Sequence, residues 1–189
     1  VRTKAQSSEA VLSELKQVLV RSPYLFAGYG LFRETARKLH AQTKDSTYPA
    51  QVQALLQSAP PEYRYSVFQA VDLFWLAVDS SELEQAKNQL AVATQRGLDS
   101  SSLIELQAYW FQVSNQFADS IASYQQALKL RPSVTSRYNL ALSYWWNSDL
   151  TQAKQQLLQV LAITADYKYA TQLLASIYLL QGDVSSAVT

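Results

Sequence analysis

Cysteine and methionine are both absent from the 189-residue chain, and only 4 glycines and 5 prolines interrupt it. Without cysteine, disulfides, zinc ribbons and thiol nucleophiles are excluded. No apolar run approaches the roughly 18 residues that span a bilayer, and no signal peptide is visible. We therefore expect a mostly helical, soluble and cytoplasmic chain without membrane insertion. Because translation starts with methionine, Val1 also leads us to expect a fragment of a larger protein.

An excess of either charge is also lacking, since 16 basic residues face 15 acidic ones and the net charge is +1. Proteins that neutralise many phosphates need a basic excess, so we expect no nucleic-acid partner. The chain is 48% hydrophobic and 16% charged, which is typical of a folded chain with a real core rather than of a disordered one.

Residue sets that perform catalysis are missing as well. His40 is the only histidine, which excludes a His-based triad and a multi-histidine metal site. Gly28 and Gly30 form a Gly-x-Gly, but no third glycine and no Lys-Ser/Thr follow, so close helix packing explains them better than a phosphate loop. Glu82 and Glu84 stand at a predicted helix start, where the helix dipole favours acids. We expect no enzyme activity, no cofactor and no metal in this segment.

What the chain does contain is an internal repeat with a period of about 34 residues. Its clearest copy spans residues 101–133, with the sequence SSLIELQAYWFQVSNQFADSIASYQQALKLRPS. Apolar residues recur at helical spacing in both halves, which predicts two amphipathic helices joined at 114–116. Pro132 ends the second helix.

Small residues mark the second helix of each copy at Ala86, Ser120, Ala153 and Ala187, at spacings of 34, 33 and 34. Two helices approach closely only where side chains are small, and a larger side chain would overpack the contact by roughly 1–3 kcal/mol. An ordinary helical bundle is the alternative, but it needs no fixed period.

The copy at 101–133 resembles a tetratricopeptide repeat (TPR), a helix-turn-helix unit with small residues where its helices cross. The residues that match this family's pattern are Ala108, Phe111, Ser120, Tyr124, Ala127 and Pro132. The resemblance implies an all-α fold, a right-handed superhelix (α-solenoid) of antiparallel TPR-like helix hairpins.

The predicted organisation is one continuous superhelical domain. Residues 1–66 are expected to form divergent TPR-like hairpins, and residues 67–189 the TPR-like repeats. The expected repeat boundaries are 67–100, 101–133, 134–167 and an incomplete 168–189.

The resemblance also implies a ligand-binding groove on the concave side, which is lined by the first helix of each repeat. Carried over position by position, the groove residues expected in this chain are Phe68, Val71, Asp72, Trp75, Glu105, Tyr109, Tyr138, Asn139, Leu142 and Trp145. They include no lysine or arginine, which disfavours a carboxylate clamp and favours a protein or peptide with an apolar segment. The alternative is that these aromatics only fill the interior of the superhelix.

Three successive aromatics, Tyr144, Trp145 and Trp146, cannot all face one core, because a helix turns about 100° per residue. The repeat pattern predicts that Tyr144 packs within its hairpin and that Trp145 faces the groove. Trp146 is expected near the groove rim or the next unit.

The function that we predict is a non-catalytic TPR protein-interaction module, with self-association into a homo-oligomer as a further possibility. A looser similarity links the segments SPYLFAGYGLFRETARKL, FQAVDLFWLA and YNLALSYWWNSDL to helical-repeat regions of bacterial signalling proteins. The alternative prediction is therefore a regulatory or substrate-positioning region of a bacterial serine/threonine kinase or winged-helix regulator.

Overall fold

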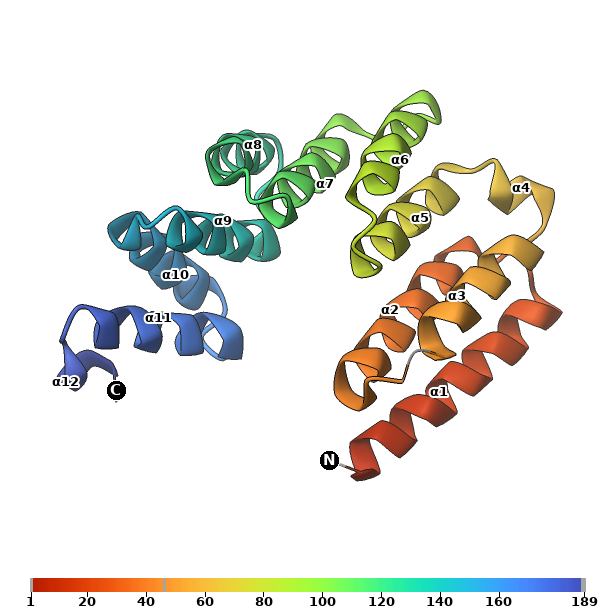
Figure 1. Cartoon of the computed structure of the whole chain (residues 1–189), viewed down its shortest axis with the longest axis horizontal. Helices are drawn as coiled ribbons and strands as arrows, with labels where there is room; N and C mark the ends of the chain where they lie inside the picture. Colours follow the sequence, from red (N-terminus) through yellow and green to blue (C-terminus); the bar gives the residue numbers. More distant parts are fainter. Residues whose placement is uncertain (1, 46, 188–189) are drawn as a thin grey trace. The chain divides into compact units, whose positions relative to one another are not determined.

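The computed structural model describes residues 2–45 and 47–187, with the side chains of 8–45 and 47–187, and every regular element in those ranges is a helix (Figure 1). The chain divides into two compact units, residues 1–98 and 99–189. This division falls two residues before the expected boundary between the repeats 67–100 and 101–133. Each unit is therefore described by itself, and the single continuous domain stays a prediction.

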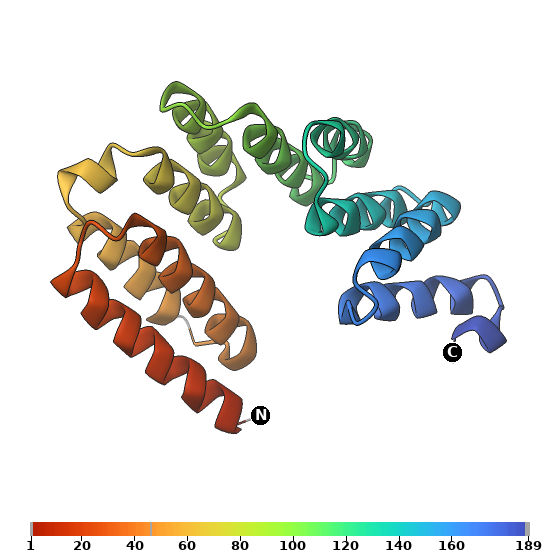
Figure 2. The same cartoon turned by 180° about the vertical axis from the view of Figure 1, so that it is seen from behind.

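The first unit contains six described helices (Figures 1 and 2). α1 packs on α2, α2 packs on α3 and α5, and α5 forms a hairpin with α6. The bounds of these helices are α1 Arg2–Arg21, α2 Phe26–Thr43, α3 Thr47–Ser58, α4 Pro61–Arg64, α5 Val67–Asp79 and α6 Leu83–Gln95.

Large side chains fill the core of the first unit. Tyr29, Phe32 and Tyr63 are almost completely buried, and the rings of Tyr29 and Tyr63 stack with centroids 4.1 Å apart. Gly28 allows α1 and α2 to approach closely, because a Cβ at this position would lie 2.9 Å from Cδ2 of Leu19. Close packing, rather than phosphate binding, therefore explains this glycine.

The second unit consists of three successive hairpins, shown in green to blue in Figure 1. Within it, α7 pairs with α8, α9 with α10, and α11 with α12, while α8 packs on α9 and α10 on α11. The bounds are α7 Ser100–Val113, α8 Phe117–Leu130, α9 Val134–Trp146, α10 Leu150–Ile163, α11 Lys168–Leu180 and α12 Val184–Ala187.

Small residues lie where the helices of the second unit cross. Ala108, Ser120, Ala141 and Ala153 are all 0% exposed. The Ser120 hydroxyl donates to the Ala108 carbonyl oxygen at 2.9 Å and lies 2.8 Å from the hydroxyl of Ser143. A serine therefore fits this crossing because its hydroxyl is both small and hydrogen-bonded.

The turns between paired helices repeat one backbone conformation. Ser81, Asn115, Ser148 and Gly182 all have positive φ, between 60° and 76°. In each case the next residue donates its N–H to a carbonyl five residues back, as from Asp149 to Tyr144 at 2.9 Å. This bond is the mark of a Schellman motif, which ends one helix and turns the chain into the next.

Candidate functional site

A pocket of about 400 Å³ opens in the second unit between α7 and α9, beside the start of α8. Apolar atoms make up most of its wall, and none of the described residues that line it carries a formal charge. These residues are Tyr109, Gln112, Val113, Asn115, Phe117, Asn139, Leu142 and Trp146.

The repeat period brings equivalent residues of two successive repeats to this pocket. Tyr109 of α7 corresponds to Leu142 of α9, and Val113 corresponds in the same register to Trp146. Both helices begin at a side-chain cap, since Asp99 accepts a backbone N–H at the start of α7 and a serine does the same for α9. Because the two residue pairs stand in one register, the same face of α7 and of α9 contributes to the pocket wall.

Buried polar groups fix the base of the pocket. Gln112 is 3% exposed, and its Nε2 donates to the backbone oxygen of Asn139 at 3.2 Å, which ties α7 to α9. The Tyr124 hydroxyl donates to Oε1 of the same glutamine at 3.4 Å. Burial raises the pKa of Tyr124 well above its ordinary value, so this hydroxyl stays protonated.

An aromatic pair forms the outer side of the pocket. The ring centroids of Phe117 and Trp146 lie 5.8 Å apart, and Trp146 keeps 48% of its surface exposed. Sequence reasoning did not expect Asn115 and Phe117 here, because the family's groove positions lie on the first helix of each repeat. The positive φ of Asn115 turns the chain so that Phe117 begins α8 beside the pocket.

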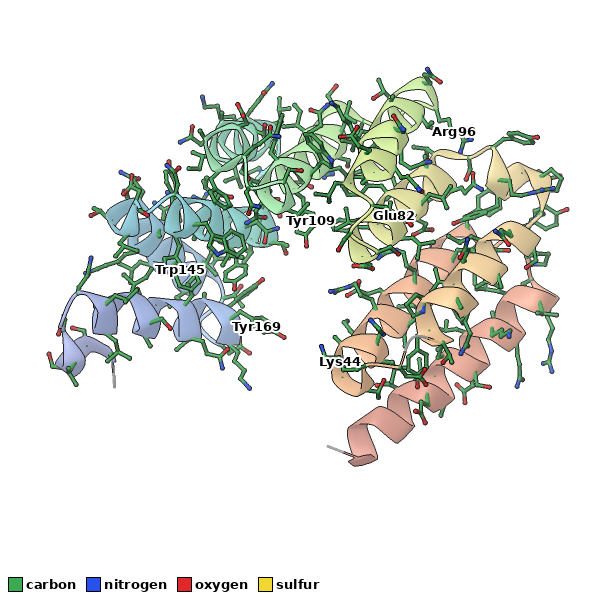
Figure 3. All side chains as sticks on the ribbon, in the orientation of Figure 1. Lys44, Glu82, Arg96, Tyr109, Trp145 and Tyr169 are labelled. Carbon is green, nitrogen blue, oxygen red and sulfur yellow. The ribbon has the colours of Figure 1, made fainter. Side chains whose placement is uncertain are left out.

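Tyr109, Asn139 and Leu142 of the predicted groove come together in this pocket, whereas Trp145 is not among the residues that line it. Trp145 is half-buried and packs against the core that α9 and α10 share with α11 (Figure 3). The sequence predicts that Trp145 faces the groove, and the tryptophan on the wall of this pocket is its neighbour Trp146.

Tyr138 and Glu105 lie outside the pocket lining and have partners of their own. Tyr138 joins a cluster of tyrosines, with ring centroids 5.2 Å from Tyr167 and 6.5 Å from Tyr169. Glu105 pairs with Arg131 at 3.3 Å and accepts a hydrogen bond at 2.9 Å from a serine hydroxyl of α9. The charge of Glu105 is thus neutralised within the unit. In the tyrosine cluster, most of the surface of Tyr169 remains exposed.

Asp72 departs from the predicted groove in the first unit, because its side chain is buried and only 5% exposed. The Tyr63 hydroxyl donates to Oδ2 at 2.6 Å, and Nε of Arg33 donates to Oδ1 at 3.1 Å. Burial raises the pKa of Asp72, although both hydrogen bonds favour the charged form. The groove prediction is corrected at this position, since the carboxylate joins α2, α4 and α5 instead of facing a ligand.

The remaining predicted residues of the first unit, Phe68, Val71 and Trp75, lie on α5. The guanidinium of Arg33 lies 5.6 Å from the ring centre of Trp75, and the ring of Phe68 lies 6.0 Å from that of Phe26. Phe68 is half exposed, and Val71 and Trp75 are partly buried. Sequence reasoning missed Arg33, because the repeat pattern gives no position for a residue of α2.

Comparison of the sequence with models of known families finds no match, and comparison with curated proteins finds none either. Solved structures do match. TTC0263, a TPR protein of Thermus thermophilus, is similar with a TM-score of 0.71 at 19% identity, and the match covers 95% of each chain. YrrB, described as a TPR protein with an unusual peptide-binding site, gives 0.54 at 13% identity over 92% of this chain and 86% of its own.

A third similar structure is that of PilF of Pseudomonas aeruginosa, with a TM-score of 0.62 at 14% identity over 85% of this chain and 73% of its own. These likenesses confirm the predicted fold class, an all-α solenoid of antiparallel TPR-like hairpins. The chain accordingly has the helical-repeat fold of these structures.

Membrane spans and metal-binding clusters are both absent from the part of the chain that the structure describes. No helix there is both long and apolar enough to cross a bilayer. Among residues 2–45 and 47–187, no group of three or more histidine, aspartate or glutamate side chains is placed to hold a metal ion.

Proposed function

We propose that the second unit binds a partner protein by enclosing one large apolar side chain in the pocket between α7 and α9. The observation that carries this proposal is the pocket itself, a cavity of about 400 Å³ with an uncharged lining and the half-exposed Trp146 on its wall. Tryptophan and tyrosine supply much of the binding energy at protein interfaces, because they bury large areas at a small cost in conformational entropy.

The chemistry of the lining favours an apolar ligand over an anionic one. The described lining contains no lysine, arginine or histidine, so a carboxylate or phosphate would lose hydration there without gaining an opposite charge. The buried hydrogen bond from Gln112 holds α7 and α9 at a fixed separation before a ligand arrives. Such preorganisation reduces the entropy lost on binding.

A peptide selection tests this proposal. Random peptides displayed on phage are selected on the full chain, and the affinity of the enriched peptides is measured by calorimetry. We expect enrichment of phenylalanine, tryptophan or leucine. Trp146→Ala and Leu142→Glu should each weaken binding at least about 10-fold, which corresponds to about 1.4 kcal/mol.

The matched control is Tyr65→Ala, which removes an aromatic side chain that is 77% exposed and lies in the first unit. It should leave the affinity unchanged, and circular dichroism should show that all three variants remain folded. Peptides that bind both pocket variants as tightly as the parent chain would rule the pocket out as the binding site.

A regulatory role beside a kinase or winged-helix domain, and homo-oligomerisation, both stay predictions. The first is tested by sequencing the complete reading frame that encodes this chain. The second is tested by sedimentation of the chain over a range of concentrations. If either role depends on the pocket between α7 and α9, the Trp146→Ala variant should weaken it.

A further inference from the structure

Each unit also has a groove whose lining residues do not line the pocket between α7 and α9. In the first unit a groove of about 380 Å³ lies among α3, α5 and α6. Leucines and glutamines dominate its surface, and Glu82 is the only charged residue in its described lining. The lining residues that matter here are Gln53, Leu56, Gln57, Leu73, Gln85 and Gln89.

In the second unit a groove of about 460 Å³ lies among α8, α9 and α10. It again combines glutamines with an apolar base, and Lys129 and Arg137 are the charged residues in its described lining. The lining residues that matter here are Gln125, Leu128, Lys129, Leu140, Gln152 and Gln156.

The two grooves correspond position by position. On the first wall, Gln53, Leu56 and Gln57 of α3 stand at one constant offset in sequence from Gln125, Leu128 and Lys129 of α8. At the base, Leu73 of α5 corresponds to Leu140 of α9. On the second wall, the offset between those two leucines also relates Gln85 and Gln89 to Gln152 and Gln156. Five of these six paired positions carry the same residue type in both grooves, and Lys129 replaces Gln57 at the sixth.

Most of the glutamine amides in these grooves are open to a ligand. Gln69, Gln125 and Gln156 already have hydrogen bonds to other side chains. The other amides bond to no residue among those that the structure describes, and they belong to Gln53, Gln57, Gln85, Gln89, Gln152 and Gln155.

We propose that each groove binds an uncharged polypeptide segment in an extended conformation, chiefly through the main chain of that segment. A glutamine amide carries both a donor and an acceptor, so a wall of glutamines can pair with the N–H and C=O groups of a peptide. An extended peptide sends alternate side chains to one side, where the leucine base would take a small or leucine-sized group.

Charge selects the kind of partner. The charged residue in the described lining of the first groove is Glu82, whereas those of the second are Lys129 and Arg137. A charged side chain that gains a partner in one groove would meet a like charge in the other, so the ligand that fits both grooves is uncharged. The inference is independent of the pocket between α7 and α9, which is lined by other residues.

Nuclear magnetic resonance can observe these amides directly. The probe is a nine-residue peptide of alternating serine and leucine with blocked ends, added to the ¹⁵N-labelled full chain with Trp146→Ala, which removes the pocket's main anchor. We expect the side-chain NH₂ signals of the groove glutamines in both units to shift. Gln85→Lys and Gln152→Lys should each abolish the shifts in their own groove and leave those of the other groove.

Gln95→Lys and Gln126→Lys are the matched controls, because both side chains are exposed on α6 and α8 and neither lines a groove. They should bind the peptide as the parent does. A peptide with a methylated main chain, which lacks most N–H donors, should bind at least about 10-fold more weakly, a loss of about 1.4 kcal/mol. Equal binding of that peptide, or glutamine signals that do not move at millimolar peptide, would overturn the proposal.

Discussion

The two units hold similar helices together by different means. In the second unit, contact depends on small side chains, with Ala108 and Ala153 fully buried where helices cross. The first unit also has fully buried small residues, such as Ala70 and Ala86, but there Asp72 adds a charged network that bonds both Arg33 and Tyr63 across three helices. Repeats with small residues at the 34-residue period pack on their neighbours through those residues. The first unit also needs specific contacts between residues far apart in the sequence.

Of the variants considered, removal of the Asp72 carboxylate should have the largest effect on the free energy of unfolding, and it should act on the first unit alone. Asp72→Ala deprives Arg33 and Tyr63 of this partner, and loss of one member of a buried ion pair typically costs about 3–5 kcal/mol. Hydrogen exchange should accelerate in α2, α4 and α5 and remain unchanged in α9 and α10. Glu62→Ala, at an exposed acid of the same unit, is the control. Equal acceleration in both units would contradict the separate roles.

A larger side chain at a small site of the second unit should destabilise that unit. Ala153 is 0% exposed, so Ala153→Leu should overpack the contacts of α10 and lower the free energy of unfolding by about 1–3 kcal/mol. Ala162→Leu, at an exposed alanine of the same helix, should have little effect. Thermal denaturation measures both changes, and an unchanged melting temperature for Ala153→Leu would remove the proposed crossing.

A glycine at a turn should produce the smallest change and stabilise the chain. Ser148 has a φ of 64°, a conformation that glycine adopts without steric strain. Ser148→Gly should therefore add about 0.5–1 kcal/mol to the free energy of unfolding. Asn147→Gly is the neighbouring control, because its φ of −79° gives glycine no advantage and the variant should lose stability. Urea denaturation distinguishes the two, and destabilisation by both variants would show that the serine conformation is unstrained.

Local rules made much of this fold predictable. The period predicts small residues at 120 and 153 where helices cross, and both side chains are completely buried in the structure. Pro132 predicts a helix end, and α8 ends two residues earlier at Leu130. Such features depend on residues near one another in the sequence, so a local pattern is enough to reveal them.

The candidate site was only partly predictable, because its details depend on contacts between helices. Asp72 has the right repeat position for a groove, yet Arg33, which lies in a different helix, holds it in the interior. Trp145 and Trp146 differ in the sequence by position alone, and the packing of Trp145 against the core shared with α11 decides which of them reaches the pocket. No local pattern carries that information.

The repeated turn has a consequence for the order in which the chain acquires its structure. Each described hairpin of the second unit is closed by hydrogen bonds between residues close in sequence, such as the bond from Gln116 to Phe111 at 2.9 Å. Contacts this local form rapidly, because little chain entropy is lost in closing the loop. Each turn can therefore form early in folding, whereas the helices that it joins become stable only when they pack on their neighbours.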